Sequence, residues 1–253
     1  MTDAATLSTS LPRADVPAGT RGRRTELACA WLGLVGLAVS LLGFSLARFF
    51  PVPPKANDTS AEVVHFYTEH LTTFRIGAML AGLGVCFIGP VLALITLQMW
   101  RMARGTTPVL AILQAITGAV TWVLLLIPMI IFEVVAFHPE ANPDTTRALH
   151  DLAWLLFLTP VGPFAGQNLI IAAGIFSDHS ADPVLPRWLG YLNVWVGISF
   201  VPALMAYFLK TGPFAWHGIF VFYFGVGFYG LWLLAMAVEL IKSVNRHYAS
   251  GWA

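Results

Sequence analysis

The sequence predicts an all-α, polytopic membrane protein, a bundle of six transmembrane helices with both termini in the cytoplasm. Of its 253 residues, 57% are hydrophobic and 11% are charged, whereas soluble domains carry about 25% charged residues. So few charges cannot cover a water-facing surface, and hydrocarbon is the simplest solvent for this chain. A membrane-spanning helix needs roughly 20 mostly apolar residues. Six segments qualify, at 27–49, 74–100, 109–132, 150–176, 187–209 and 216–241.

The first 26 residues differ from the rest of the chain. They are polar, rich in Pro, Gly, Ala and Thr, and contain four arginines. The apolar stretch that follows is too long for the hydrophobic segment of a signal peptide and lacks a small-residue cleavage site. We therefore expect a disordered cytoplasmic tail (1–26), a six-helix transmembrane domain (27–242) and a cytoplasmic C-terminal tail (243–253).

Lysine and arginine predict the orientation, because cytoplasmic loops carry an excess of both. An N-terminus inside the cell places nine of them in cytoplasmic segments and five in outer segments. The cytoplasmic set is Arg13, Arg21, Arg23, Arg24, Arg101, Arg104, Arg187, Lys242 and Arg246. The outer set is Arg48, Lys55, Arg75, Arg147 and Lys210.

The charge balance and the cysteines exclude some partners and cofactors. The net charge is +1, which gives no basic surface for nucleic acid, so the lipid bilayer is the expected partner. Cys29 and Cys86 both lie in apolar stretches. A thiol in such a stretch behaves as a small hydrophobic group, so neither a disulfide nor a metal site is predicted from them.

The first outer loop contains a predicted amphipathic helix. It begins with Pro-Val-Pro-Pro at 51–54, which cannot be helical and forces an extended path out of the bilayer. Thr59 and Glu62 then have the spacing of a capping box. We expect the helix to occupy residues 60–73 and to lead into the second span.

Five of the seven histidines lie at or near the outer membrane boundary in this topology, together with several carboxylates. Imidazole and carboxylate side chains could together bind Zn²⁺ or another divalent metal, or relay protons. The possible metal ligands are Glu62, His65, Glu69, His70, His138 and His150. The alternative is that these are ordinary solvated or capping residues, since no His-Glu-x-x-His or Cys-x-x-Cys pattern occurs in the sequence.

Span four contains two prolines and two glycines between residues 160 and 166. Pro160 is expected near the middle of the bilayer, where it would kink or break the helix. Irregular backbone at that depth survives only beside protein or a water-filled cavity, and the amides that follow are costly in hydrocarbon. We expect an internal cavity that opens towards the outer histidines, with a Pro-kinked packing helix as the alternative. The pocket candidates are His150, Asp151, Thr159, Gln167, Asn168 and His217.

Span six combines aromatic residues with Gly225, Gly227 and Gly230. The glycines allow close helix approach, and the aromatic side chains either line an apolar pocket or fill the core. No Asp, Glu, Lys or Arg occurs near the middle of any predicted span. Ion-coupled transporters usually place such a group there, which counts against that class.

Three motifs resemble those of a family of uncharacterised actinobacterial integral membrane proteins. They are Phe-Pro-Val-Pro-Pro (50–54), Pro-Arg-Trp-Leu-Gly-Tyr (186–191) and Thr-Gly-Pro-Phe-Ala-Trp-His-Gly (211–218). The resemblance covers most of the chain from about residue 27. It implies a multi-pass protein of a bacterial plasma (inner) membrane, and it assigns no activity or catalytic residue.

Three functional classes fit the sequence. The first is a protein with an outward-facing pocket for a lipid or apolar small molecule, or an accessory subunit of a membrane complex. The second is a membrane-embedded enzyme that uses the outer His/carboxylate cluster on a lipid-like substrate, through a metal or by acid–base catalysis. The third is a transporter built from helical hairpin repeats. The first is favoured because it requires no missing motif.

Overall fold

The computed structural model describes residues 18–249 of the chain, and these residues are helical with no strand. Six segments among them are long and apolar enough to cross a membrane. They are Thr20–Leu46, Leu71–Met102, Val109–Phe137, Pro143–Ser177, Arg187–Tyr207 and Ile219–Ala249. Each predicted span overlaps one of them, so the predicted all-α class and the six spans are confirmed.

Two of the spans are continuous α-helices and the other four each change their helical geometry once. The continuous ones are α1 (Ala18–Leu46) and α5 (Val109–Phe137). The second span consists of α3 (Leu71–Cys86) and α4 (Ile88–Met102), and the fourth of α6 (Pro143–Leu158) and α7 (Val161–Ser177). The fifth is α8 (Arg187–Ser199) followed by a 3₁₀-helix, η1 (Val201–Tyr207). The sixth is a π-helical turn, η2 (Ile219–Tyr223), followed by α9 (Phe224–Ala249).

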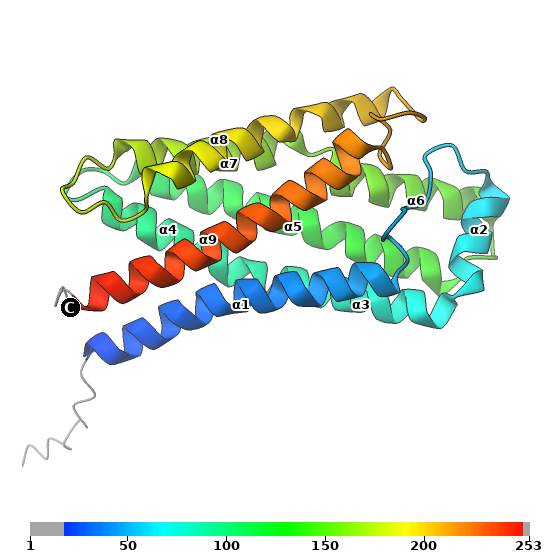
Figure 1. Cartoon of the computed structure of the whole chain (residues 1–253). Coiled ribbons are helices and arrows are strands. Elements are labelled where there is room, and N and C mark those ends of the chain that lie inside the picture. The colour runs from blue at the N-terminus through cyan, green and yellow to red at the C-terminus, as the bar shows by residue number, and fades with distance from the viewer. Residues whose placement is uncertain (1–17, 250–253) are drawn as a thin grey trace, which may run out of the picture.

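The six spans form a closed ring. Each span packs against the next one along the chain, and α9 packs against α1. Figure 1 shows α1 and α9 side by side at one end of the bundle, from which they diverge towards the other end. We call the end that holds the described chain termini the terminal end, and the opposite end, which holds α2 (Ser60–Glu69), the α2 end.

The amphipathic helix of the first long loop is confirmed. Thr59 is its N-cap, with the Glu62 N–H donating to the Thr59 hydroxyl and the Thr59 N–H donating to the Glu62 carboxylate. These two reciprocal hydrogen bonds satisfy N–H groups that the helix cannot pair itself. α2 ends at Glu69 rather than at the predicted residue 73, because His70 leaves the helical conformation (φ −135°, ψ 42°) before α3 begins.

α1 and α3 pack with their backbones in close contact at two pairs of glycines. A Cβ atom on Gly43 would lie 2.6 Å from the Gly77 carbonyl oxygen, and one on Gly77 would lie 2.7 Å from the Gly43 carbonyl oxygen. Gly36 and Gly84 have the same reciprocal relation at 2.6 Å. Small residues let membrane helices approach this closely, and dispersion contacts between backbones replace the missing hydrophobic driving force.

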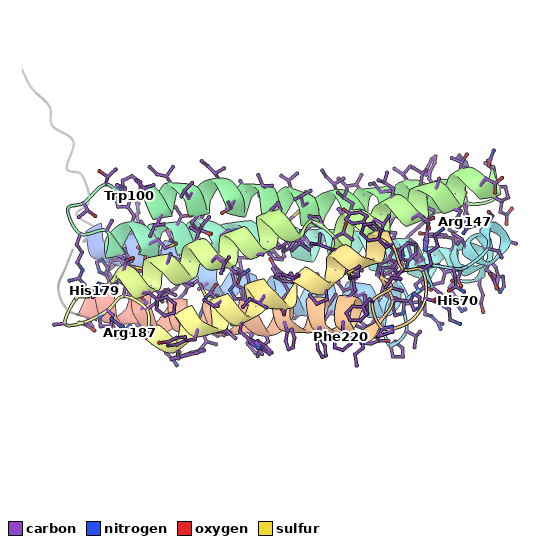
Figure 2. The ribbon with its side chains drawn as sticks, turned by 90° about the horizontal axis from the view of Figure 1, so that it is seen from above. His70, Trp100, Arg147, His179, Arg187 and Phe220 are labelled. Atoms are coloured by element: carbon purple, nitrogen blue, oxygen red, sulfur yellow. The ribbon has the colours of Figure 1, made fainter. Side chains whose placement is uncertain are left out.

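The two ends of the bundle differ in charge. Over the described residues, the terminal end carries eight Lys and Arg against four Asp and Glu, and the α2 end carries five against seven. Figure 2 shows Arg187 and His179 at the terminal end and His70 and Arg147 at the opposite end. The asymmetry agrees with the positive-inside rule, and the cytoplasmic placement of the terminal end stays a prediction.

The predicted tails overlap the first and last helices. α1 begins at Ala18 and α9 runs to Ala249, so the parts of the expected tails at 18–26 and 243–249 are helical. The remaining tail residues, 1–17 and 250–253, lie outside the described part of the chain.

Candidate functional site

His150 lies in α6 and is completely buried at the α2 end. Its Nδ1 atom is 2.8 Å from the Tyr67 hydroxyl oxygen of α2, and its Nε2 atom has no hydrogen-bond partner among the described residues. The rings of Trp154 and Trp216 lie edge-on to it, with centroids 6.2 and 6.1 Å away. Burial, and then the negative charge of half-buried Asp151, raise the pKa of Tyr67 well above its ordinary value. His150 therefore helps to hold α2 on the bundle and does not face water.

His217 connects two loops at the α2 end that are far apart in the sequence. Its Nδ1 atom accepts a hydrogen bond from the Ala56 N–H (3.1 Å), and the indole N–H of neighbouring Trp216 donates to the Pro54 carbonyl oxygen (2.9 Å). Partial burial lowers the pKa of His217 below its ordinary value. An acceptor nitrogen must be unprotonated, so this contact requires neutral His217.

The possible metal ligands on α2 make local contacts. Glu62 is occupied by the capping box with Thr59. The Glu69 carboxylate oxygens lie 3.7 Å from His65 Nε2 and 3.5 Å from His70 Nε2. The His65 and Glu69 side chains are more than half exposed, which is the arrangement of a solvated helix face.

The two remaining possible ligands lie apart from that group. His138 is exposed, with its ring against that of Phe137 (centroids 4.6 Å apart), whereas His150 is buried. Within residues 18–249, no group of three or more His, Cys, Asp and Glu side chains is arranged to hold a metal ion. The six side chains therefore do not converge on one centre in this structure.

Two spans break, and both breaks follow from proline. α6 ends at Leu158 and α7 begins at Val161, on either side of Thr159 and Pro160, as the sequence predicts. α3 and α4 meet at Phe87, because Pro90, which has no N–H, cannot continue the hydrogen-bond ladder there. The Thr159 hydroxyl itself points to η1, where it lies 2.6 Å from the Tyr207 hydroxyl.

A cavity of about 80 Å³ lies inside the ring, between these two breaks. All six spans contribute to its wall, which is almost entirely apolar. One wall residue from each span, in chain order, is Leu37, Val85, Leu125, Phe157, Phe200 and Val226. Loss of regular helix at the breaks leaves space that side chains do not fill, which is the reason the cavity sits at this level.

Aromatic rings separate the cavity from the buried histidine. Phe44 and Phe157 belong to the cavity wall, and their centroids are 5.6 Å apart. Phe49 packs on Phe44 (5.8 Å) and on Trp154 (4.7 Å), which in turn contacts His150. The expected cavity is present beside the span-four break, but this cluster of rings, and not an open path, lies between it and the histidine.

The cavity opens at the side of the bundle, next to α1. Leu41 belongs to its wall and is 43% exposed. On the α9 side the wall includes Gly225, and a Cβ atom there would meet nothing within 4 Å. Because α1 and α9 diverge at this level (Figure 1), the opening faces the surrounding bilayer.

Two hydroxyl groups interrupt the apolar wall. Tyr229 of α9 has a buried hydroxyl oxygen with no hydrogen-bond partner among the described residues. Ser40 of α1 donates a long hydrogen bond, 3.4 Å, to the Ala81 carbonyl oxygen. Neither residue is among the predicted pocket candidates, although the glycine-rich aromatic stretch that contains Tyr229 is a possible pocket wall by its sequence.

Gln167 and Asn168 lie elsewhere on α7, Gln167 facing α5 and Asn168 facing α8, where a Cβ atom on Gly197 would lie 3.4 Å from the Asn168 Cβ. A Cβ atom on Gly118 would lie 3.1 Å from Gln114 Nε2 and 3.5 Å from Gln167 Nε2, so the two amides meet at this glycine. The Asn168 amide donates to the Phe164 carbonyl oxygen (2.9 Å). The six predicted pocket residues are thus divided among the α2 end, the span-four break and the contacts of α7 with α5 and α8.

The fold and the cavity define a class, that of a multi-pass α-helical membrane protein with an apolar central cavity. The ring of six spans, in which the aromatic cluster closes the cavity towards the α2 end, does not by itself assign a more specific class of protein. No family model, curated protein or solved structure matches the chain.

Proposed function

We propose that this protein binds a lipid or another apolar small molecule in its central cavity. The observation that carries the proposal is a largely apolar cavity of about 80 Å³ to which all six spans contribute, with Tyr229, whose hydroxyl has no partner among the described residues, in its wall. Small-molecule sites typically enclose about 300–1,000 Å³ and combine an apolar lining with a few polar groups that fix orientation. The cavity has the second property. Its volume of about 80 Å³ is below that range, so a ligand would occupy it with part of its length and would extend through the side opening into the bilayer.

The chemistry of the wall specifies the ligand class. A long-chain molecule with one hydrogen-bonding group, such as a fatty acid, an isoprenoid alcohol or a lipid acyl chain, matches the lining. Tyr229 would bind its polar group, because an unpaired buried hydroxyl costs about 1–3 kcal/mol. The ligand would reach the cavity from the bilayer, past Leu41, without crossing an aqueous phase.

The setting is the plasma (inner) membrane of a bacterium, with the terminal end in the cytoplasm. The excess of Lys and Arg at that end supports this orientation, and the three motifs that resemble actinobacterial membrane proteins support the bacterial setting. The α2 end then faces outward. The same cavity suits a protein that acts alone and an accessory subunit of a membrane complex.

The test fills the cavity from one helix position. Gly225→Trp places an indole where a Cβ meets nothing within 4 Å in the cavity wall, and Gly227→Trp is the matched control, since its Cβ also meets nothing within 4 Å. Gly227 is exposed and is not part of the wall. Both variants would be purified in detergent and titrated with a fluorescent polyene fatty acid.

We expect Gly225→Trp to abolish saturable binding and Gly227→Trp to bind as the wild type does. Tyr229→Phe should retain binding but weaken it about tenfold, the equivalent of one lost hydrogen bond of 1–1.5 kcal/mol. Equal binding by the wild type and both tryptophan variants would show that the probe only partitions into detergent, and the proposal would then be wrong.

A further inference from the structure

A second cavity lies at the terminal end and has the opposite character. It is a pocket of about 500 Å³, open to the solvent and lined mostly by polar and charged residues. Its walls come from the end of α4, the loop between α7 and α8, and the last turns of α9. Three arginines, Arg101, Arg104 and Arg246, and His247 line it. We call it the basic pocket.

Two of these arginines are held by neutral acceptors. Arg104 donates from Nη2 to the Asp182 carbonyl oxygen (3.1 Å), and Arg246 donates from Nη2 to the Val184 carbonyl oxygen (3.0 Å). A carbonyl oxygen orients a guanidinium group without cancelling its charge. Each guanidinium has five N–H donors in a rigid fork, so donors remain for a ligand in the pocket.

Two nearby carboxylates, those of Asp178 and Asp182, offset part of the charge of this pair. Asp178 accepts hydrogen bonds from the N–H and hydroxyl of Ser180 and from the Val184 N–H. Burial opposes its ionisation, but these bonds and the charge of Arg104 hold the pKa of Asp178 below its ordinary value. Asp178 therefore shapes the loop. Asp182 lies 3.6 Å from Arg246 and is 82% exposed, so it forms a weak, solvent-screened pair.

The inner wall of the pocket is fixed by a separate network. Arg101 forms two hydrogen bonds with the buried Glu26 carboxylate, of 2.7 and 2.6 Å. Gln98 donates to the same carboxylate and accepts from the Ser243 hydroxyl, both at 3.4 Å. Tyr248 also donates to Glu26 (2.9 Å). α1, α4 and α9 are thus joined behind the pocket, and the charge of Arg101 is balanced there.

We propose that the basic pocket binds a phosphate group through Arg104 and Arg246. Two oriented guanidinium groups match the several acceptor oxygens of a phosphate, to which arginine donates paired hydrogen bonds. The phosphate belongs either to the headgroup of an anionic phospholipid or to a soluble molecule. Basic pockets between membrane helices at the cytoplasmic surface bind anionic headgroups, and the excess of basic residues at this end concentrates either source.

The experiment uses the full chain in neutral detergent and two probes. Phosphatidylglycerol, with diacylglycerol as the comparison that lacks a phosphate, is followed by native mass spectrometry, and inorganic phosphate is followed by calorimetry. The variants are Arg104→Gln and Arg246→Gln, made singly. Arg187→Gln is the matched control, since Arg187 is an exposed arginine of the same end that does not line the pocket.

We expect each pocket variant to weaken phosphatidylglycerol binding about tenfold, the equivalent of one charge-assisted hydrogen bond, and Arg187→Gln to bind normally. If phosphatidylglycerol binds in this arginine-dependent way and inorganic phosphate does not, the source is a lipid headgroup. If inorganic phosphate alone binds in that way, the source is soluble.

The proposal would be overturned if neither probe depends on Arg104 and Arg246, or if the Arg187 control loses as much binding as they do. Wild-type thermal unfolding in both pocket variants would establish that the loop between α7 and α8 still folds. Should Arg246→Gln unfold, Arg104→Gln is sufficient, because the exposed Arg104 side chain makes a single hydrogen bond to the loop.

Discussion

Replacement of Gly77 by alanine should separate α1 from α3. The added Cβ would clash with the Ala47 backbone nitrogen, and it would lie 2.7 Å from the Gly43 carbonyl oxygen and 2.8 Å from the Leu46 carbonyl carbon, all of them backbone atoms. Ordinary contacts of a Cβ begin at 3.4 Å. The helices must therefore move apart by about 1 Å to relieve the contact with the Ala47 nitrogen, because none of these backbone atoms can rotate away.

The magnitude follows from the weaker dispersion attraction along the separated interface. A gap of 0.5–1 Å forfeits about a quarter to a half of each dispersion contact, and overpacking of one methyl group typically costs about 1–3 kcal/mol. We expect Gly77→Ala to lower the free energy of unfolding by about 2 kcal/mol. Alanine at an open helical glycine instead stabilises by about 0.5–1 kcal/mol. Gly166 in α7, where a Cβ meets nothing within 4 Å, provides that comparison.

The assay is reversible unfolding in mixed micelles, with increasing sodium dodecyl sulfate and detection by the fluorescence of the nine tryptophans. Gly77→Ala should unfold at a lower mole fraction of the denaturing detergent than the wild type, and Gly166→Ala at an equal or higher one. Unfolding of the two variants within 0.5 kcal/mol of each other, a margin of about twofold in the equilibrium constant, would refute the close-packing argument.

Two further perturbations concern opposite ends of the bundle. Glu26→Ala removes the buried carboxylate that joins three helices, and it should destabilise the protein by about 3 kcal/mol, because the partner guanidinium loses its counter-charge. The pKa of His217 is lowered in the folded protein, chiefly by burial. Stability should therefore be complete above pH 6.5, the ordinary value, and should fall as the pH drops below it, where the unfolded chain binds the extra proton.

Thermal unfolding between pH 7.5 and 5 measures the loss of stability that protonation of His217 causes. His217→Asn keeps an acceptor for the Ala56 N–H but does not titrate, so it should remove much of the pH dependence seen below 6.5. An unchanged slope in His217→Asn would assign the effect to another group. For Glu26, the exposed acidic residue Glu140 gives the control, and Glu140→Ala should unfold as the wild type does.

The elements that sequence predicts well are those with local causes. Pro160 marks the break in span four because its missing N–H removes a hydrogen bond from its own helix. Thr59 and Glu62 form their capping box from atoms three residues apart. The spans follow from composition alone. Each of these features is complete within a few turns of chain, and the structure contains all of them.

The candidate site depends on contacts that no local pattern contains. His150 belongs to the boundary group by position, yet Tyr67 and Trp216 cover it from segments more than 60 residues away. Tyr229 has the same local setting as the other aromatic residues of span six, and only the divergence of α1 and α9 places it at a cavity. Two local signals lead towards the cavity, the helix break at Pro160 and the glycine-rich aromatic stretch of span six.

The ring of spans has a topological consequence. The first and last helices are neighbours, and Tyr248 lies against Gly22, so the chain closes on itself at one side of the bundle. The chain could therefore be circularly permuted: a short linker would join α9 to α1, and new termini would be made at the Gly105 turn. Because the number of spans is even, every span would keep its original direction across the membrane. The order in which the spans enter the membrane would change while the final packing stays the same. In this protein the sequence order and the packed arrangement are separable.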